Sequence, residues 1–293
     1  MNPGSRSTPN PGTMAVLLMF CTIRPAAGEP VDPVQLLREL QIRYESMRSY
    51  SATGDVTSVI NISEVPLSDA AQGPARAAQE SHHRFTIKLG RPELYRIEWK
   101  QQMPSFTTKG ALWSDGSARV LTVPGQKSPV EPQDTQTALA MATGISGGVA
   151  NTIPSAFFAF KGSSFTALTD TRLDGEETIE GDPCYVIKAH LADQGVTLWI
   201  SKATHLLRQK RHDFARPRSM PELGDDDVRR ALESWNREAS DEAIKAMRAQ
   251  LEAARAMMNL MSGYSVEVHR DIRIDVPVRL SEFRIRKPSR GHK

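Results

Sequence analysis

The residues with the most recognisable chemistry run from Gly144 to Gly148, read Gly-Ile-Ser-Gly-Gly, and fit the G-x-S-x-G pattern of serine hydrolases. In that pattern Ser146 would be the nucleophile, and Asp170 and several histidines follow it in an order that a catalytic triad permits. The pattern requires a buried strand before the serine and a helix after it. Here the preceding segment is Ala-rich and predicts a helix, so a Gly-rich hinge is the better interpretation. We expect a protein that is not an enzyme, with a serine hydrolase as a distant alternative.

The sequence offers no convincing metal or cofactor site. His82 and His83 are adjacent, but no carboxylate follows them at the spacing of metal ligands. Residues 225–227 are three aspartates before a predicted helix, where acidic side chains stabilise the helix dipole, and they form no calcium-loop motif. Cys184 is the only cysteine outside the N-terminal segment, so an intramolecular disulfide is not expected. We therefore predict no metal and no cofactor.

The composition is that of a soluble globular protein. The chain has 293 residues, of which 39% are hydrophobic, enough for a core, and its net charge is +3. This charge is too small to indicate nucleic-acid binding. A basic stretch at residues 208–218 contains one aromatic residue, Phe214, and no RNA- or DNA-binding motif. We expect no nucleic-acid partner.

The N-terminal segment has the features of an export signal. Arg6 is positively charged, residues 15–23 form a short apolar run, and small residues at 26–28 suit a cleavage site. We predict a signal peptide over residues 1–28 and a periplasmic location. Cys21 is not expected to carry a lipid anchor, because the bulky Phe20 precedes it where a lipoprotein signal has a small residue.

Alternation of apolar and polar residues is clearest between Phe85 and Val123. A period of two predicts strands with one buried and one exposed face. A Gly-Arg-Pro-Glu turn at residues 90–93 and a Ser-Asp-Gly-Ser turn at residues 114–117 separate three such strands. One face of the second strand carries Tyr95, Ile97 and Trp99.

A helix and a long strand are predicted before this region. Asp32 suits the N-cap, Pro33 the first turn, and Gln35 completes a capping-box pattern. The expected apolar face of the helix consists of Val34, Leu37, Leu40, Tyr44 and Met47. The period changes to two near Ser49 and predicts a strand to residue 62, followed by a loop at 64–80.

The second half of the chain predicts an apolar helical segment and another antiparallel meander. The helical segment covers 135–145 and is followed by a Phe-rich stretch at 153–160. Short strands are expected at 165–173, 177–179, 184–191, 196–201, 206–214, 266–278 and 283–285.

The order of these motifs resembles that of the LolA/LolB-type lipoprotein carriers. The resemblance rests on the helix end YESMRSY (44–50), the basic-Pro turn at Arg91, and the Asp-Gly hairpin at 114–117. It also rests on GEETIEGDPCYVIKA (175–189) and VTLWISKATHLLRQK (196–210). It implies an α+β fold: an incomplete, strongly curved antiparallel β-barrel with helices across its concave face. We expect one such β domain over residues 29–293.

The resemblance also implies a function, a ligand site and a latch. It implies a monomeric periplasmic protein that binds lipoprotein acyl chains or other lipids and exchanges them with a membrane-bound donor or acceptor. The expected cavity is apolar and lined by Tyr95, Ile97, Trp99, Leu112, Phe157 and Phe158. By resemblance, Arg91 would bond to backbone carbonyls of the lid helix and keep the cavity closed. Whether the barrel is hollow or filled by side chains stays open from the sequence.

A helical insert at about residues 216–263 departs from the compact carriers. Its apolar residues step by three and four, which predicts two helices. It could pack on its own domain, cover an open end of the barrel or bind a partner, since Met-rich faces suit adaptable binding. The insert supports an alternative function on the same fold, an envelope stress sensor or regulatory interaction protein.

Overall fold

A computed structural model describes residues 31–62, 78–103, 106–126, 128–160, 165–192, 194–214, 224–234, 239–258 and 261–284. The chain divides into Met1–Pro30, which lies outside the described residues, and the unit Val31–Lys293. The predicted export signal and most of the predicted loop at 64–80 therefore fall outside the described part. Within the described ranges, no helix is long and apolar enough to cross a membrane.

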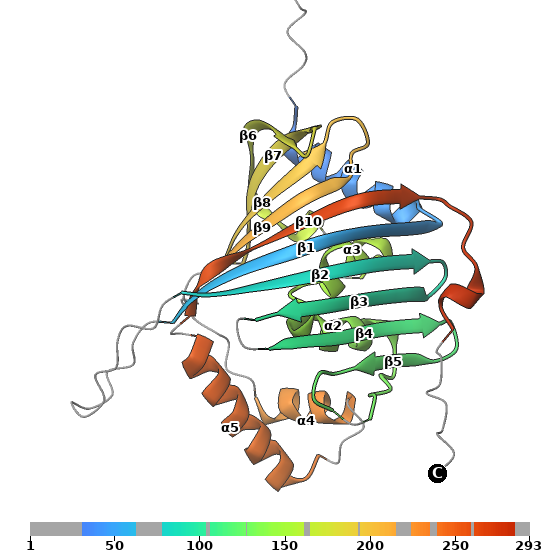
Figure 1. The fold of residues 1–293 in the computed structure, drawn as a ribbon. Coiled ribbons are helices and arrows are strands. Elements are labelled where there is room, and N and C mark those ends of the chain that lie inside the picture. Colours follow the sequence, from blue (N-terminus) through green and yellow to red (C-terminus); the bar gives the residue numbers. More distant parts are fainter. Residues whose placement is uncertain are drawn as a thin grey trace, which may run out of the picture. The chain divides into compact units, whose positions relative to one another are not determined.

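Ten antiparallel strands form one sheet in the order β5-β4-β3-β2-β1-β10-β9-β8-β7-β6 (Figure 1). The first five are β1 (Ser49–Ile62), β2 (Gln79–Gly90), β3 (Leu94–Gln102), β4 (Thr107–Asp115) and β5 (Arg119–Thr122). The others are β6 (Thr169–Ile179), β7 (Asp182–Leu191), β8 (Gln194–Ser201), β9 (Leu207–Phe214) and β10 (Met261–Ile274). Because β5 and β6 are the two edges, the curved sheet is not closed into a barrel. Each half is a run of consecutive strands, and the halves meet where β1 pairs with β10.

Three helices lie on one face of this sheet (Figure 1): α1 (Pro33–Ser46), α2 (Thr135–Ile145) and α3 (Val149–Phe157). The predicted cap of α1 is present, because Asp32 accepts a hydrogen bond from the Val34 amide at 2.9 Å. In the same way Asp134 accepts from the Thr137 amide at 2.7 Å and begins α2 at the predicted residue. These caps satisfy amides that a helix cannot satisfy internally.

The helices and the inner faces of the strands enclose one hydrophobic core. Along β2 and β3 every second side chain is buried, which is the consequence of period-two patterning on a sheet with one covered face. Residues of α1, α2, α3 and both halves of the sheet belong to this core.

Two details differ from the sequence predictions. The α1 helix buries Leu36 and Gln41 beside the predicted residues, whereas Val34 is 49% exposed because it lies one turn before the packed face. The segment predicted as a strand from residue 165 begins with a 3-10 helix, η1 (Phe165–Ala167). Phe283 and Arg284, predicted in a strand at 283–285, instead follow a 3-10 helix, η2 (Leu280–Glu282), and are not in a strand. Phe283, next to η2, is nevertheless buried, so its apolar side chain anchors a turn rather than a strand.

The predicted insert contains two helices, α4 (Asp225–Ser234) and α5 (Asp241–Met258). They pack against each other through a small core of their own, formed by Val228, Leu232, Ile244 and Met247. The insert ends where β10 begins, at Met261.

Candidate ligand-binding site

The six predicted lining residues meet in one apolar region, four of them from β3 and β4 and two from the end of α3. Five of them are at most 3% exposed and belong to the main core, and Phe158 packs at its border: Tyr95, Ile97, Trp99, Leu112, Phe157 and Phe158. In this conformation their side chains fill the space between the sheet and the helices. The packing is tight enough to require Gly110 opposite Trp99, because a Cβ atom there would lie 2.2 Å from the indole ring.

Arg91 lies where three backbone carbonyls converge. Its guanidinium donates to the carbonyl of Glu45 at 2.7 Å, to that of Met47 at 3.3 Å, and to that of Phe157 at the end of α3. The same group stands 4.5 Å from the centre of the Phe157 ring. A guanidinium offers five donors in a fixed plane, so one side chain can tie the ends of α1 and α3 to the turn before β3.

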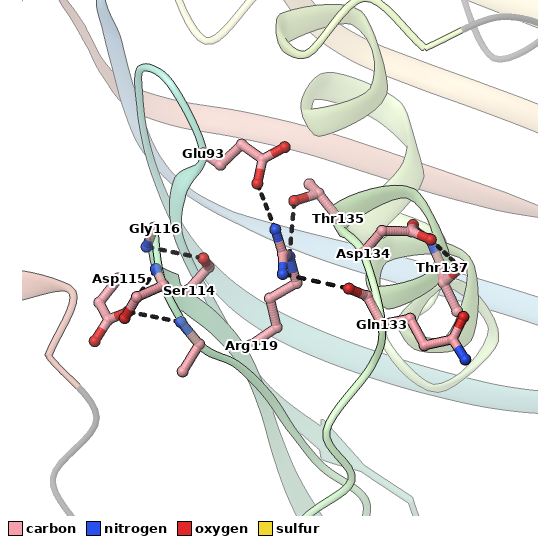
Figure 2. A network of polar contacts seen from close by, with 11 residues as sticks. Glu93, Ser114, Asp115, Gly116, Arg119, Gln133, Asp134, Thr135 and Thr137 are labelled. Atoms are coloured by element: carbon pink, nitrogen blue, oxygen red, sulfur yellow. Dashed lines mark hydrogen bonds and ion pairs between the residues drawn. The ribbon is translucent and has the colours of Figure 1, made fainter. Parts of the chain in front are cut away.

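A second arginine holds the other end of the helix pair (Figure 2). Arg119 on β5 donates to the Thr135 hydroxyl at 3.2 Å and to the Gln133 carbonyl at 3.4 Å, at the start of α2. It also pairs with the Glu93 carboxylate at 2.6 Å. The sequence reasoning missed Arg119, because its three partners are distant from it in the sequence. We call α2 and α3 together the helix lid.

The G-x-S-x-G segment is the turn inside this lid. Ser146 is fully buried between α2 and α3, donates to the Thr143 carbonyl at 3.2 Å and accepts from the Ala150 amide at 3.2 Å. Gly147 and Gly148 follow with φ of 70° and 96°, which glycine adopts without strain. A helix precedes the serine, so the strand–turn–helix of a nucleophile elbow is not formed here.

A polar cluster, which the sequence reasoning also missed, occupies the interior under β9 and β10. Oε1 of Glu267 and Nε2 of His269, both on β10, lie 2.9 Å apart, and Nδ1 of His269 lies 3.4 Å from the Tyr50 hydroxyl. Thr152 on α3 donates to Glu267 Oε2 at 2.7 Å and accepts from the Lys210 ammonium at 3.1 Å. We call these five residues the polar cluster.

Burial shapes the pKa values of the ionisable groups in this region. Burial lowers the pKa of Lys210, an effect that the charge of Glu267 partly offsets. Burial alone would raise the pKa of Glu267, but its hydrogen bond to His269, together with the charges of His269 and Lys210, holds the pKa below its usual range. Burial and the neighbouring Lys210 lower the pKa of His212, next to the cluster on β9, to about 4. The lid therefore covers a charged carboxylate as well as an apolar core.

Alternation could have suggested the polar cluster but not its orientation. Along β10, Val266 and Val268 alternate with Glu267 and His269, and a period of two does not say which set faces inward. The structure puts the valines on the outer face, and Glu267 and His269 are 4% and 0% exposed. The signal available was that Lys210 on β9 and Glu267 on β10 have opposite charges, and the register pairs them directly.

No protein-family model and no curated protein matches this sequence. Among solved structures, the chain is similar to the lipoprotein LppX of Mycobacterium tuberculosis, with 10% identity, coverage of 85% of this chain and 100% of that one, and a TM-score of 0.39. It is similar to LprF of Mycobacterium bovis, with 10% identity, coverage of 85% and 95%, and a TM-score of 0.41. It is also similar to a LolA superfamily protein of Nitrosomonas europaea, with 13% identity, coverage of 87% and 99%, and a TM-score of 0.29.

At these identities and TM-scores the likenesses carry no conclusion about family or function. The architecture described above, an open, curved, ten-stranded antiparallel sheet with helices on one face, is the one that the sequence motifs predict. The predicted α+β fold, an open antiparallel sheet with helices on one face, is thus confirmed.

Proposed function

We propose that the protein is a non-enzymatic periplasmic binding protein for lipoprotein acyl chains or other lipids, which it carries across the cell envelope. The observation that supports this best is the helix lid, which covers the apolar face of the sheet and is fastened at its ends by arginines. Arg91 bonds to the Phe157 carbonyl at the end of α3, and Arg119 bonds to Thr135 at the start of α2. A lid held by side chains can leave the sheet without breaking any strand pairing.

Opening of the lid would create the site for acyl chains. The residues it now covers, Tyr95, Ile97, Trp99 and Leu112, form a continuous apolar surface on β3 and β4. Burial of acyl chains on such a surface contributes about 0.8 kcal/mol per CH₂ group, so ten groups contribute roughly 8 kcal/mol. This gain is large enough to offset the loss of contacts between lid and sheet.

In this proposal Arg91 is the latch of the closed form. Hydrogen bonds to a charged group contribute about 1.5–3 kcal/mol each. Loss of one such bond is therefore enough to shift an equilibrium between closed and open lids by about tenfold. Because the closed form competes with the ligand, a weaker latch raises the apparent affinity for lipid.

Displacement of a fluorescent fatty acid by a palmitoylated peptide tests the function. We expect displacement at micromolar concentrations, a changed emission from the buried Trp99, and no displacement by the same peptide without its acyl chain. A folded protein that binds neither the fatty acid nor the lipopeptide at these concentrations would contradict the proposal.

Arg91→Leu tests the latch. We expect it to leave the circular dichroism spectrum unchanged and to increase the apparent affinity for the lipopeptide about tenfold. Arg84→Leu is the matched control, because Arg84 is largely exposed and its nearest described carboxylate is 3.6 Å away. If Arg91→Leu and the wild type bind and release the lipopeptide equally, Arg91 is only a turn residue and not a latch.

A regulatory interaction protein is the second candidate, and the helical insert favours it. The α4 and α5 helices have a separate small core, which suits a module that presents a surface to another protein. Deletion of residues 224–258 distinguishes the two candidates. A carrier keeps lipopeptide binding after the deletion, whereas an interaction protein loses its envelope partner in crosslinking experiments and keeps its fold.

A further inference from the structure

A cavity of about 260 Å³ opens at the turn of the helix lid. Its walls are Gly147 and Gly148 from the lid, Ser58 from β1, and Lys210, His212 and Glu267 from β9 and β10. Liquid water occupies about 30 Å³ per molecule, so the cavity has room for roughly nine waters or for a headgroup of similar size. It lies beside the polar cluster, away from the predicted acyl site.

The cavity wall contains a cationic side chain, Lys210, with hydrogen-bond donors that are not in use within the described part of the chain. Among the described residues, Lys210 has one hydrogen bond, to the Thr152 hydroxyl, although an ammonium has three donors. Glu267 in the same wall accepts from Thr152 through Oε2, and its Oε1 lies 2.9 Å from Nε2 of His269. Within the described ranges Lys210 makes no hydrogen bond to Glu267, so its remaining donors are available to an anion.

The start of α3 adds few donors to this cavity, because its first amides already have partners. The Gly148 amide donates to the Thr143 carbonyl at 2.8 Å, and the Ala150 amide donates to Ser146 Oγ at 3.2 Å. The donors that can reach a ligand in the cavity are therefore side chains.

Two buried imidazole nitrogens at this place also lack partners. Nε2 of His212, in the cavity wall, and Nδ1 of His83 have no hydrogen bond among the described residues. His83 is 4% exposed, and its Nδ1 would lie 3.2 Å from a Cβ atom added at Gly147, so it points at the lid turn. Buried polar atoms usually have a partner, and a bound polar group would supply one.

The cavity is adjacent to the apolar interior. Phe85 on β2 lies in the apolar core, and its ring contacts the His269 ring of the polar cluster with 5.3 Å between centres. His83 precedes Phe85 on the same face of β2. One amphiphilic molecule could thus place its acyl chains on the Phe85 side and its polar group on the His83 side.

We propose that this cavity binds the phosphate-containing headgroup of the lipid whose acyl chains the protein carries, with Lys210 as its main donor and the imidazole nitrogens of His212 and His83 beside it. The inference rests on the proposed function and adds the class of ligand to it. It predicts selection between lipids that have the same acyl chains.

The test compares two short lipids that differ only in the phosphate, dioctanoyl phosphatidic acid and dioctanoylglycerol, by displacement of the fluorescent fatty acid. We expect the phosphatidic acid to bind at least tenfold more tightly to the full chain. Lys210→Gln should remove this preference, and Lys109→Gln, which changes an exposed lysine, should keep it.

A second pair of variants avoids any change of the buried charges. Ser58→Leu adds a side chain to the cavity and should also remove the preference, whereas Thr57→Leu adds the same side chain on the other face of β1 and should not. Equal affinity for the two lipids in the wild type would overturn the headgroup site and leave lipid binding intact. Binding of inorganic phosphate but of neither lipid, if abolished by Lys210→Gln, would make the cavity a site for free phosphate and overturn the lipid proposals. If none of the three probes binds, both proposals are wrong.

Discussion

The lid covers two interiors of opposite character. Under β3 and β4 it covers apolar side chains such as Ile97 and Leu112, which are fully buried and make no demands on hydrogen bonding. Beside β9 and β10 it covers Glu267, His269 and Lys210, whose polar groups need specific partners. The first interior can lose the lid and be covered by any acyl chain, because apolar burial is not directional. The second interior can release the lid only to a ligand that replaces the hydrogen bonds of Thr152. It is therefore suited to discriminating between ligands by their polar groups, whereas the first accepts any acyl chain.

The largest effect should come from breaking the charged interior. We expect Glu267→Ala to lower the free energy of unfolding by about 3–5 kcal/mol, since it removes the buried acceptor of Thr152 and leaves the half-buried Lys210 with no carboxylate opposite it. Urea denaturation measures this change. Glu98→Ala is the control, because Glu98 pairs with Arg96 at 2.6 Å but both side chains are about 40% exposed, and such surface pairs contribute at most about 1 kcal/mol. Equal losses in the two variants would contradict the difference between the interiors.

Truncation of a side chain in the apolar interior should lower the free energy of unfolding by somewhat less than Glu267→Ala does. Leu112→Ala is expected to lower the free energy of unfolding by about 3 kcal/mol, from lost burial and the space left behind. The same change at the exposed Leu191 should stay within about 0.5 kcal/mol. The difference between these variants, again from urea denaturation, reports how tightly the closed lid packs. A loss below about 1 kcal/mol for Leu112→Ala would mean that this interior is loosely filled.

A smaller, local effect should follow from releasing the start of the lid. Arg119→Gln removes the charged donor that holds Thr135 and Gln133. We expect amide hydrogen exchange in α2 to become about tenfold faster, which corresponds to about 1.4 kcal/mol, while exchange in β1 and β10 stays unchanged. Arg96→Gln changes an arginine on the outer face of the sheet and should leave amide exchange in α2 unchanged. Faster exchange throughout the sheet would show that Arg119 stabilises the whole fold and not the lid.

A pH dependence should belong to the polar side alone. Burial lowers the pKa of His83 and takes that of His212 to about 4, so both imidazoles are neutral in the fold at pH 7. Between pH 6.5 and about 4 the unfolded chain binds protons that the folded chain excludes, and the free energy of unfolding therefore decreases as the pH falls. We expect a Tm lower by several degrees at pH 5.0 than at pH 7.5.

Substitution identifies the groups responsible for this dependence. The double variant His83→Gln and His212→Gln should reduce the difference in Tm between the two pH values. His190→Gln, which changes an exposed histidine, should not alter it. A pH dependence that persists in the double variant would assign it to groups outside this region.

Local patterns were sufficient to predict most of the elements. The helix at Thr135–Ile145 was predicted with the observed bounds, and alternation placed Tyr95, Ile97 and Trp99 on one buried face of β3. These succeed because capping and period-two burial depend on neighbours in the sequence. Val34 was predicted on the buried face of α1 but is exposed, because contacts with distant segments decide which residues of the helix are packed.

Features that depend on contacts between distant segments could not be predicted in the same way. The inward orientation of Glu267 depends on the register between β10 and β9, and the role of Arg119 depends on the position of α2 over β5. For the latch, only the resemblance of the Arg91 turn indicated carbonyl partners, and Arg91 does contact three carbonyls. Its effect on lipid release stays a prediction.

The pairing of β1 with β10 has a consequence for the way this fold can form. The two runs of strands, β1 to β5 and β6 to β10, can each assemble from neighbours in the sequence, but they join only through strands from opposite ends of the described chain. Contacts of such long range are slow to form. Until β10 arrives, β1 keeps an unpaired edge, and such edges promote association between chains. We therefore expect the pairing of β1 with β10, in the middle of the sheet, to form last, and a chaperone that covers β1 until then would prevent association between chains.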